Sequence, residues 1–213
     1  MEYIRVNDFP MLNIADGLGI KGGTAVTIGK FEGFHSGHQL LLKRILELEK
    51  KGLKSTVLQL IGTGKEPIIS SAKRKELLVK LGINYFIECP LFHEIAEMTP
   101  EEFVAEIVVK QLHAKYLVIG ADFQFGHNRE GNSEFLKVLQ EKYGYIVEVI
   151  EKKQYHGRDI SSTYIREELE QGNIDTVNEL LGHKQIIGEQ EDVLDNELDI
   201  DDRRRSAFSR KCD

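Results

Sequence analysis

The chain has 213 residues, of which 41% are hydrophobic, enough to form one sizeable buried core. Its formal net charge of -7 argues against a nucleic-acid or anionic-membrane partner, and no apolar run approaches the roughly 20 residues of a membrane span. Two cysteines far apart in sequence fit a reducing cytosol, and the start of the chain lacks the apolar core of a signal peptide. We therefore expect a cytoplasmic protein.

Apolar strands and amphipathic helices alternate along the chain. Strands separated this regularly by helices predict a Rossmann-like α/β fold, a doubly wound parallel sheet of about five strands. The string T-P-E-E at residues 99–102 predicts a capped helix start with a capping box. Strands are predicted at residues 24–29, 55–61, 85–88, 116–120 and 145–150, and helices at 37–51, 71–81, 100–112, 132–143, 162–171 and 174–181.

A short histidine motif lies between the first predicted strand and the first predicted helix. It reads H-S-G-H at residues 35–38, directly before a leucine-rich helical stretch. Parallel α/β sheets bind ligands beyond the carboxyl ends of their strands, where the next helix offers unpaired N–H groups and the positive end of its dipole. Two imidazoles at that place can both donate hydrogen bonds to phosphate oxygens, so the motif predicts a phosphate site.

Two simpler interpretations of His35 and His38 compete with this one. Histidines three residues apart could hold zinc, but no cysteine is near and the pattern is not the H-E-x-x-H of metalloproteases. A lone histidine on a helix is often merely partly buried. Gly29, Gly33 and Gly37 bracket the pair, and glycines permit a tight reversal and a close approach of the backbone. They favour the phosphate site.

A second group of polar residues opens the helix predicted at residues 162–171. Ser161, Ser162 and Thr163 stand together there, and an N-cap explains only one of the three hydroxyls. Arg166 falls in or near the first turn, where the helix dipole disfavours a cation and a bound anion would reverse that effect. Hydroxyls and a forked guanidinium at a helix start are typical of a triphosphate clamp.

Three stretches of the sequence carry a resemblance to a known family. Residues 29–39 (GKFEGFHSGHQ) resemble the G-x-F-D-G-x-H-x-G-H-Q segment of bacterial FAD synthetases, which belong to the HxGH nucleotidyltransferase superfamily. Residues 118–126 (VIGADFQFG) are similar to their G-x-D-F-x-F-G segment, and residues 160–166 (ISSTYIR) to their I-S-S-T-x-I-R. The resemblance covers residues 23–188, and its second segment is the one specific for flavin.

The resemblance implies adenylyl transfer from ATP to FMN, which gives FAD and pyrophosphate. FMN and FAD are then substrate and product, Mg²⁺ accompanies ATP, and the protein itself is expected to supply no metal site. The resemblance assigns catalysis to His35, His38 and Arg166. The residues expected to bind ATP are Gly29, Lys30, Phe31, Gly33, Gly37, Ser161, Ser162 and Thr163, and those expected at the flavin or nucleotide are Gly120, Asp122, Phe123, Phe125 and Asn128.

The loop expected at the flavin also has an ordinary explanation. Phe123 and Phe125 could be core residues, because they follow a buried strand directly. Asp122 ends the same strand, and a lone aspartate in such a place is more often a turn residue. The family likeness favours contact of these residues with flavin or nucleotide.

The chain departs from the family pattern at several places. Glu32 replaces the usual aspartate, and Lys30 stands where asparagine or another residue is common. Residues 57–62 (VLQLIG) stand where an F-D-P-H-P-like segment is expected. Two alternatives therefore stay open. One is a nucleotidyltransferase of the same superfamily with another phosphorylated acceptor, and the other is a non-catalytic paralogue that binds flavin or nucleotide.

The likeness to the family ends near residue 188. Residues 181–188 (LGHKQIIG) resemble the family's junction into a riboflavin kinase domain, but nothing like the kinase's G-F-P-T-A-N segment follows. We expect one nucleotidyltransferase domain over residues 1–188, no riboflavin kinase activity, and FMN supplied by a separate kinase. Residues 189–213, an acidic run followed by a basic one, predict a disordered charged tail.

Overall fold

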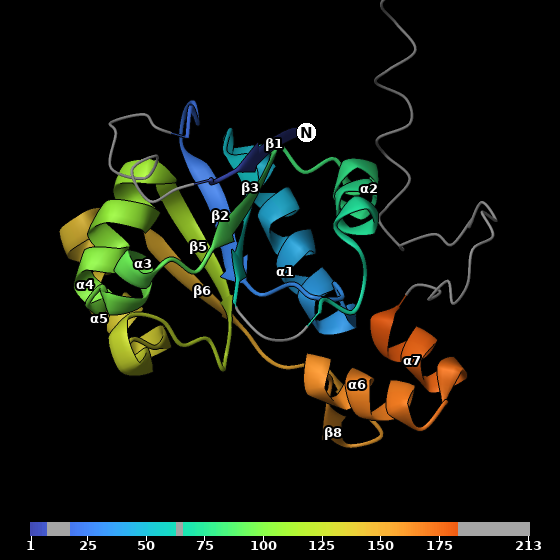
Figure 1. Ribbon diagram of the computed structural model, residues 1–213. Coiled ribbons are helices and arrows are strands. Elements are labelled where there is room, and N and C mark those ends of the chain that lie inside the picture. Colours follow the sequence, from blue (N-terminus) through green and yellow to red (C-terminus); the bar gives the residue numbers. More distant parts are fainter. Residues whose placement is uncertain (8–17, 63–65, 183–213) are drawn as a thin grey trace, which may run out of the picture.

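The main strands lie parallel in one six-stranded sheet (Figure 1). The computed structural model describes residues 1–7, 18–62 and 66–182. The strands follow the order β1-β4-β3-β2-β5-β6 across the sheet. They are β1 (Glu2–Arg5), β2 (Thr24–Gly29), β3 (Lys54–Ile61), β4 (Tyr85–Pro90), β5 (Ala114–Gly120) and β6 (Ile146–Ile150).

This strand order contains a topological switch point. From β2 the chain builds outward through β3 and β4, then returns to the other side of β2 to form β5 and β6. The loops that leave the carboxyl ends of β2 and β5 therefore run in opposite directions. Open α/β sheets bind ligands at such a switch point, and we call the region between these two loops the crevice. The H-S-G-H motif leaves β2 and the loop starting at Gly120 leaves β5.

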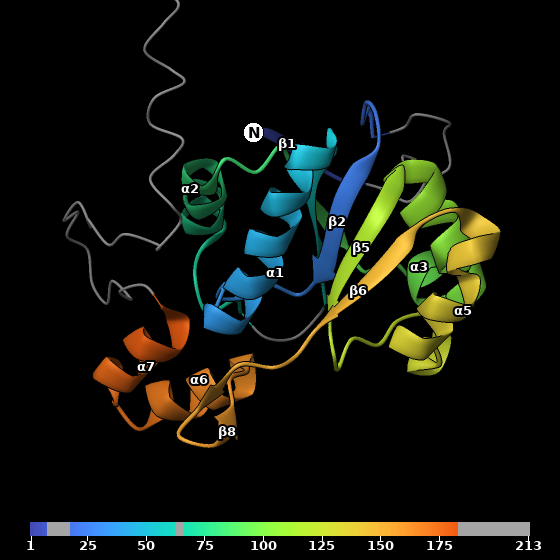
Figure 2. The same ribbon diagram turned by 180° about the vertical axis from the view of Figure 1, so that it is seen from behind.

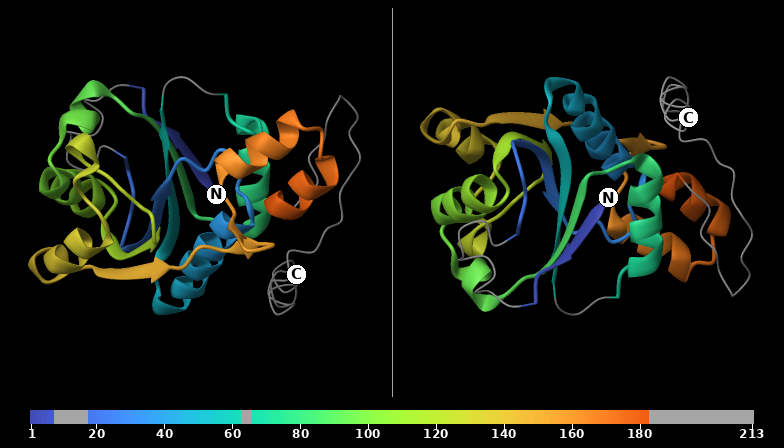
Figure 3. Two further views of the ribbon diagram at one scale, coloured as in Figure 1. Left: turned by 90° about the horizontal axis from the view of Figure 1, so that it is seen from below. Right: turned by 90° about the horizontal axis from the view of Figure 1, so that it is seen from above.

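Helices cover both faces of the sheet (Figure 2, Figure 3). One layer contains α1 and α2, and the other contains α3, η3 and α5. Helices α6 and α7 share the core of the first layer but lie beyond the carboxyl ends of the strands (Figure 1). Their bounds are α1 Ser36–Glu47, η2 Leu48–Lys51, α2 Ser71–Leu81, α3 His93–Glu97, α4 Pro100–Glu102, η3 Phe103–Gln111, η4 His127–Arg129, α5 Ser133–Tyr143, α6 Ser162–Glu170 and α7 Ile174–Leu181.

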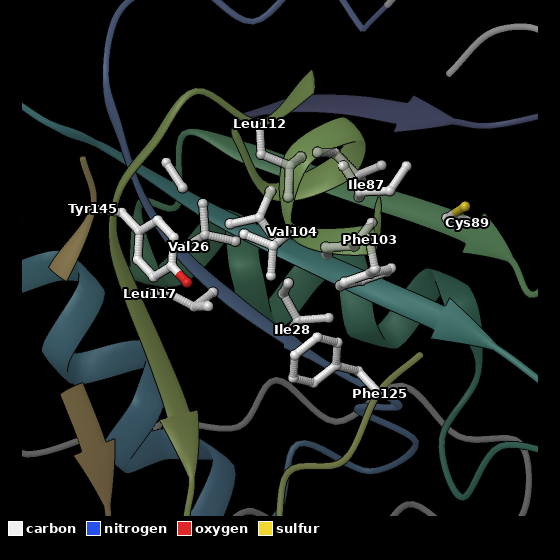
Figure 4. Packing of buried hydrophobic residues seen from close by; sticks show 14 of the residues in the cluster. Val26, Ile28, Ile87, Cys89, Phe103, Val104, Leu112, Leu117, Phe125 and Tyr145 are labelled. Atoms are coloured by element: carbon white, nitrogen blue, oxygen red, sulfur yellow. The ribbon is translucent and has the colours of Figure 1, made fainter. Parts of the chain in front are cut away.

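Each central strand sends alternate side chains to the two layers. On β2, Val26 and Ile28 enter the core under η3 and α5, whereas Ala25 enters the core under α1. On β5, Leu117 and Val118 divide in the same way. Figure 4 shows the first of these cores, in which η3 packs over the sheet. A sheet covered on both faces requires strands that are apolar at nearly every position, which the sequence supplies.

The structure confirms the predicted fold class and corrects several details. The five predicted strands are present, and the edge strand β1 is a sixth. The helix expected at residues 100–112 is wound as a π-helix over Phe103–Gln111, after a capping box at Thr99 that confirms the predicted start. The short helix α3 and a two-stranded hairpin, β7 (Gln154–Tyr155) with β8 (Arg158–Asp159), were not predicted.

Short elements were missed because they carry no detectable period. Strand β1 has four residues of mixed exposure, and α3 has five. Neither is long enough for a hydrophobic period to stand out.

Two predictions fall on residues 183–213, namely the end of the domain and the charged tail. These residues lie outside the described part of the chain. Within the described part of the chain, every helix is too short or too polar to cross a membrane.

Candidate functional site

The two histidines of the motif meet at the start of α1. His35 is the N-cap residue, and its Nδ1 accepts a hydrogen bond from the backbone N–H of His38 at 3.3 Å. The two rings stack with their centroids 3.6 Å apart. His35 is buried, and His38 is half-buried. The i and i+3 spacing thus produces one compact imidazole pair in the first turn of the helix.

Two glycines of the motif leave space that this arrangement needs. A Cβ atom at Gly37 would lie 3.2 Å from the Nδ1 and Cε1 atoms of His35, so a side chain there would press on the capping imidazole. A Cβ atom at Gly33 would lie 3.0 Å from the Leu181 side chain at the end of α7. The glycines predicted to contact ATP therefore also permit the close packing of the β2–α1 loop.

The backbone of the β2–α1 loop is strained. Phe31 and Phe34 adopt left-handed conformations, with φ of 45° and 44°, which cost a bulky residue about 1 kcal/mol or more each. Both rings are fully buried and stack with centroids 5.3 Å apart, and His38 meets Phe31 edge-on at 4.8 Å. Burial of the two phenyl rings offsets the strain and holds the loop in one shape. Such strain clusters at functional sites.

Burial keeps both histidines neutral. Loss of solvent lowers the pKa of His35 to about 4, although the Asp122 carboxylate acts in the opposite direction. The pKa of His38 lies well below its ordinary value, through burial and the neighbouring imidazole. Because Nδ1 of His35 accepts a hydrogen bond, the neutral ring carries its proton on Nε2. That Nε2–H is a donor available to an anion.

The start of α6 divides its three hydroxyls between two tasks. Ser161 is the N-cap, and its Oγ accepts from the backbone N–H of Tyr164 at 3.2 Å. Ser162 and Thr163 are the first two helical residues, and their hydroxyls bond to none of the described residues. One hydroxyl therefore caps the helix, as expected. The other two stand at its N-terminus, the positive end of the helix dipole.

Arg166 joins the start of α6 to the β2–α1 loop. Its Nη2 donates to Oε2 of Glu32 at 2.9 Å and to the carbonyl of Glu66 at 2.5 Å. Both side chains of the ion pair are less than one quarter exposed, at 23% and 21%. In this structure the Glu32 carboxylate, from the same chain, therefore balances the charge of the Arg166 guanidinium.

Two glutamines of this region were given no role from the sequence. Gln59, buried at the carboxyl end of β3, donates to the carbonyl of Lys30 at 2.6 Å. It stands within the stretch that replaces the expected F-D-P-H-P-like segment. Gln39 donates to the carbonyl of Leu181 at 2.8 Å, which ties α1 to the end of α7. Gln39 is the last residue of the first family-like segment, residues 29–39, and its place in that segment was the one feature of the sequence that could have indicated a role.

The loop after β5 separates the residues expected at the flavin. Asp122 is exposed and pairs with Lys152 at 3.0 Å. Phe123 stacks on Phe125, with centroids 5.4 Å apart, and Phe125 is buried in the core under η3, as Figure 4 shows. Core packing, the ordinary alternative, therefore holds for Phe125. Asn128 is exposed, with a left-handed φ of 52°.

The crevice brings only part of the predicted site together. Asp122 is close enough to His35 for its charge to act on that imidazole, and Arg166 touches the loop that precedes the same histidine. Among the described residues, no hydrogen bond or ring contact joins Phe125 or Asn128 to the histidines. Within those residues, no group of three or more His, Cys, Asp or Glu side chains is arranged to hold a metal ion.

Sequence comparison assigns the family. The profile of the FAD synthetase family matches residues 19–164. The chain belongs to the FAD synthetase family. It is 33% identical to the bifunctional riboflavin kinase/FMN adenylyltransferase of Escherichia coli strain K12, covering 76% of this chain and 55% of that protein. It is 32% identical to the FAD synthetase of Listeria monocytogenes, covering 74% of this chain and 68% of that protein.

The chain spans about half the length of the bifunctional riboflavin kinase/FMN adenylyltransferases that it matches. The match to the family profile begins after β1 and ends at Tyr164, two residues before Arg166. A solved structure titled a macrolide-efflux protein from Streptococcus pneumoniae superimposes with a TM-score of 0.73 at 24% identity, over 86% of this chain and 62% of that one. That likeness concerns the fold alone.

Proposed function

We propose that the chain transfers the adenylyl group of ATP to FMN, giving FAD and pyrophosphate. The observation that carries this proposal is the ion pair between Arg166 and Glu32, because it brings the start of α6 against the loop that leads into α1. Two helix N-termini then border the same crevice. One carries two imidazoles, and the other carries two hydroxyls that bond to none of the described residues. Membership in the FAD synthetase family supports the choice of substrates.

The proposed reaction is a direct displacement at phosphorus. An oxygen of the FMN phosphate attacks the α-phosphorus of ATP, a new P–O bond forms, and the bond to the β-phosphate oxygen breaks. The electron pair of that bond leaves with pyrophosphate. Such transfers depend on positioning and on neutralising charge, so the protein needs no covalent intermediate.

His35 and His38 act at the α-phosphate in this proposal. Both are neutral in the free protein, and His35 offers its Nε2–H as a donor. Negative charge placed at this turn favours the protonated form of an imidazole, so binding of the triphosphate raises the pKa of both rings. Donors fixed before the reaction stabilise the charge that develops on phosphate oxygens.

The β- and γ-phosphates are assigned to the start of α6. Ser162 and Thr163 supply hydroxyls and backbone N–H groups, and Arg166 supplies a guanidinium that neutralises the departing pyrophosphate. Ser161 contributes indirectly, as the cap that fixes this helix start. The nucleotide is proposed to lie along the β2–α1 loop, against Gly29, Lys30, Phe31, Gly33 and Gly37.

The flavin is assigned to the loop after β5. Asp122 is exposed and Phe123 is half-buried, Gly120 begins the loop, and Phe125 supports Phe123 from the core. Asn128 is proposed to reach the flavin or nucleotide from the far end of the loop. Mg²⁺ enters as part of the MgATP substrate, and no step is assigned to a metal held by the protein.

The decisive experiment is a product assay. The purified chain is incubated with ATP, Mg²⁺ and FMN, and the flavins are separated by chromatography. Formation of FAD with release of pyrophosphate supports the proposal. Parallel reactions replace FMN with phosphopantetheine or nicotinate mononucleotide, and transfer to one of these but not to FMN identifies a different acceptor. Binding of FMN or ATP without any product contradicts catalysis and indicates a binding protein.

A further inference from the structure

A buried ion pair lies at the carboxyl end of β4, outside the proposed site. Arg74 Nη2 donates to Glu88 Oε1 at 3.1 Å, and both side chains are 4% exposed. Tyr3 donates to Glu88 Oε2 at 2.6 Å, and Ser71 donates to Oε1 at 2.8 Å. Burial by itself would raise the pKa of Glu88, but these hydrogen bonds outweigh it, and its pKa lies below the ordinary value. The carboxylate is therefore ionised.

Stability alone does not account for this pair. Removing two charges from water costs about as much as their attraction returns, so a buried ion pair contributes little net stability compared with apolar residues of the same volume. Tyr3, which holds the second oxygen of Glu88, lies on β1, outside the residues that match the family profile. The carboxylate fixes the direction of the Arg74 guanidinium, and the other arm of that guanidinium has its own partner.

That second arm reaches the segment between β3 and α2. Arg74 Nη1 donates to the carbonyl of Ile69 at 2.7 Å, and the bond is buried. The backbone N–H of the same residue, Ile69, donates to the backbone carbonyl of Glu32 at 3.1 Å. A Cβ atom at Gly33 would lie 3.3 Å from the Cβ atom of Ile68, so the two segments are in close contact. Arg74 thus holds the backbone on which the β2–α1 loop rests.

Both acceptors of Arg166 come from these two segments. Glu32 supplies its carboxylate from the β2–α1 loop, and Glu66 supplies its carbonyl from the segment before α2. The contacts form one continuous series, from the Glu88 carboxylate through Arg74 and the backbone of Ile69 to Glu32 and then Arg166.

We propose that Arg74, directed by Glu88, is a positioning residue for Arg166. It fixes the two acceptors that hold the Arg166 guanidinium, without itself touching a substrate. The inference rests on the proposed function, in which Arg166 binds the β- and γ-phosphates of ATP. Displacement of a binding group by about 1 Å can cost a large factor in rate, so the position of the acceptors matters. Lysine cannot replace arginine here, because one ammonium cannot reproduce the planar fork that serves two partners.

The test is a double-mutant cycle on MgATP affinity, measured by calorimetry on the full chain at a temperature at which circular dichroism shows every variant folded. Arg74→Lys keeps a positive charge beside Glu88 but loses the planar guanidinium that binds two partners. We expect the dissociation constant for MgATP to rise about tenfold. Glu32→Gln should also weaken binding. In the double variant the effect of Arg74→Lys should largely disappear, because both changes act on Arg166 through the same contacts. The dissociation constant for FMN should stay unchanged.

Tyr145→Phe is the matched control. It removes a buried hydrogen bond, from the Tyr145 hydroxyl to the carbonyl of Leu136 at 2.8 Å, in the core on the other face of the sheet. It should lower thermal stability without changing MgATP affinity. If Arg74→Lys does not fold, Glu88→Gln, which preserves the shape of the side chain, gives the same cycle.

Three results overturn or separate the proposals. Unchanged MgATP affinity in Arg74→Lys, or effects that add fully with Glu32→Gln, overturns the positioning role. A wild-type chain that binds MgATP with the expected coupling but makes no FAD leaves the positioning role standing and contradicts the proposed reaction. A wild-type chain that does not bind MgATP overturns both.

Discussion

At the scale of single residues, the imidazole pair carries the chemical character of the site. Burial lowers the pKa of His35, and burial together with the neighbouring imidazole lowers the pKa of the half-buried His38. Both are therefore neutral, although they stand at the positive end of α1. In the structure, the Nδ1 of His38 and the Oγ of Ser36 are buried and form no hydrogen bond with the described residues. A buried polar atom without a hydrogen-bond partner costs about 1–3 kcal/mol of folding free energy. Such a cost at two atoms of one turn is consistent with a turn that serves ligand binding and not stability.

Replacing His38 tests the role assigned to this turn. His38→Ala should lower kcat about 100-fold with little change in KM, because the imidazole is proposed to act on charge that develops only in the transition state. FAD formation under steady-state conditions is the measurement. His93→Ala, at an imidazole whose side chain is 85% exposed, is the control and should have full activity. Unchanged turnover in His38→Ala would remove that residue from the mechanism.

At the scale of elements, helix ends decide where functional groups stand. Ser161 caps α6, whose Arg166 contacts the β2–α1 loop. Thr99 caps α4, whose Pro100 packs against Gly126 in the loop after β5. The capping box at Thr99 is reciprocal, because Glu102 Oε2 also accepts from the Thr99 N–H at 2.8 Å. It starts the helical stretch that continues through η3 over the sheet, and its role is structural.

Removal of that cap should affect stability and spare activity. Thr99→Ala should lower the free energy of unfolding by about 1 kcal/mol, because one N–H of the first turn loses its partner. Urea denaturation followed by circular dichroism measures the change. Ser133→Ala, at the first residue of α5, should change stability by less than about 0.5 kcal/mol. A cost at Thr99 no larger than at Ser133 would contradict this account of the cap.

At the scale of the whole molecule, the buried imidazoles link folding to pH. His35 has a pKa of about 4 in the folded chain against an ordinary value of 6.5. Between these values the unfolded chain binds more protons, so stability is complete above pH 6.5 and declines as the pH falls toward 4. A pKa difference of this size corresponds to about 3 kcal/mol.

Acid denaturation of a variant isolates this contribution. His35→Gln should lose less stability than wild type between pH 7 and pH 4.5, by about 2 kcal/mol, since glutamine does not titrate. The lowered pKa of Glu88 adds a further loss on acidification, but in both proteins, so it cancels in the comparison. Equal pH dependence of the two unfolding free energies would contradict the burial effect at His35.

A parallel sheet of about five strands, the sequence of strands and helices along the chain and the two helix starts that border the crevice could be predicted from the amino acids. These follow from local signals: hydrophobic periods, the H-S-G-H string after a strand, and consecutive hydroxyls before a helix. Tertiary structure alone decided that Glu32 holds Arg166, that Phe125 packs in the core and that β1 completes the sheet. The physical reason is separation along the chain, because a contact between residues 134 positions apart, as at Glu32 and Arg166, leaves no trace in a local pattern.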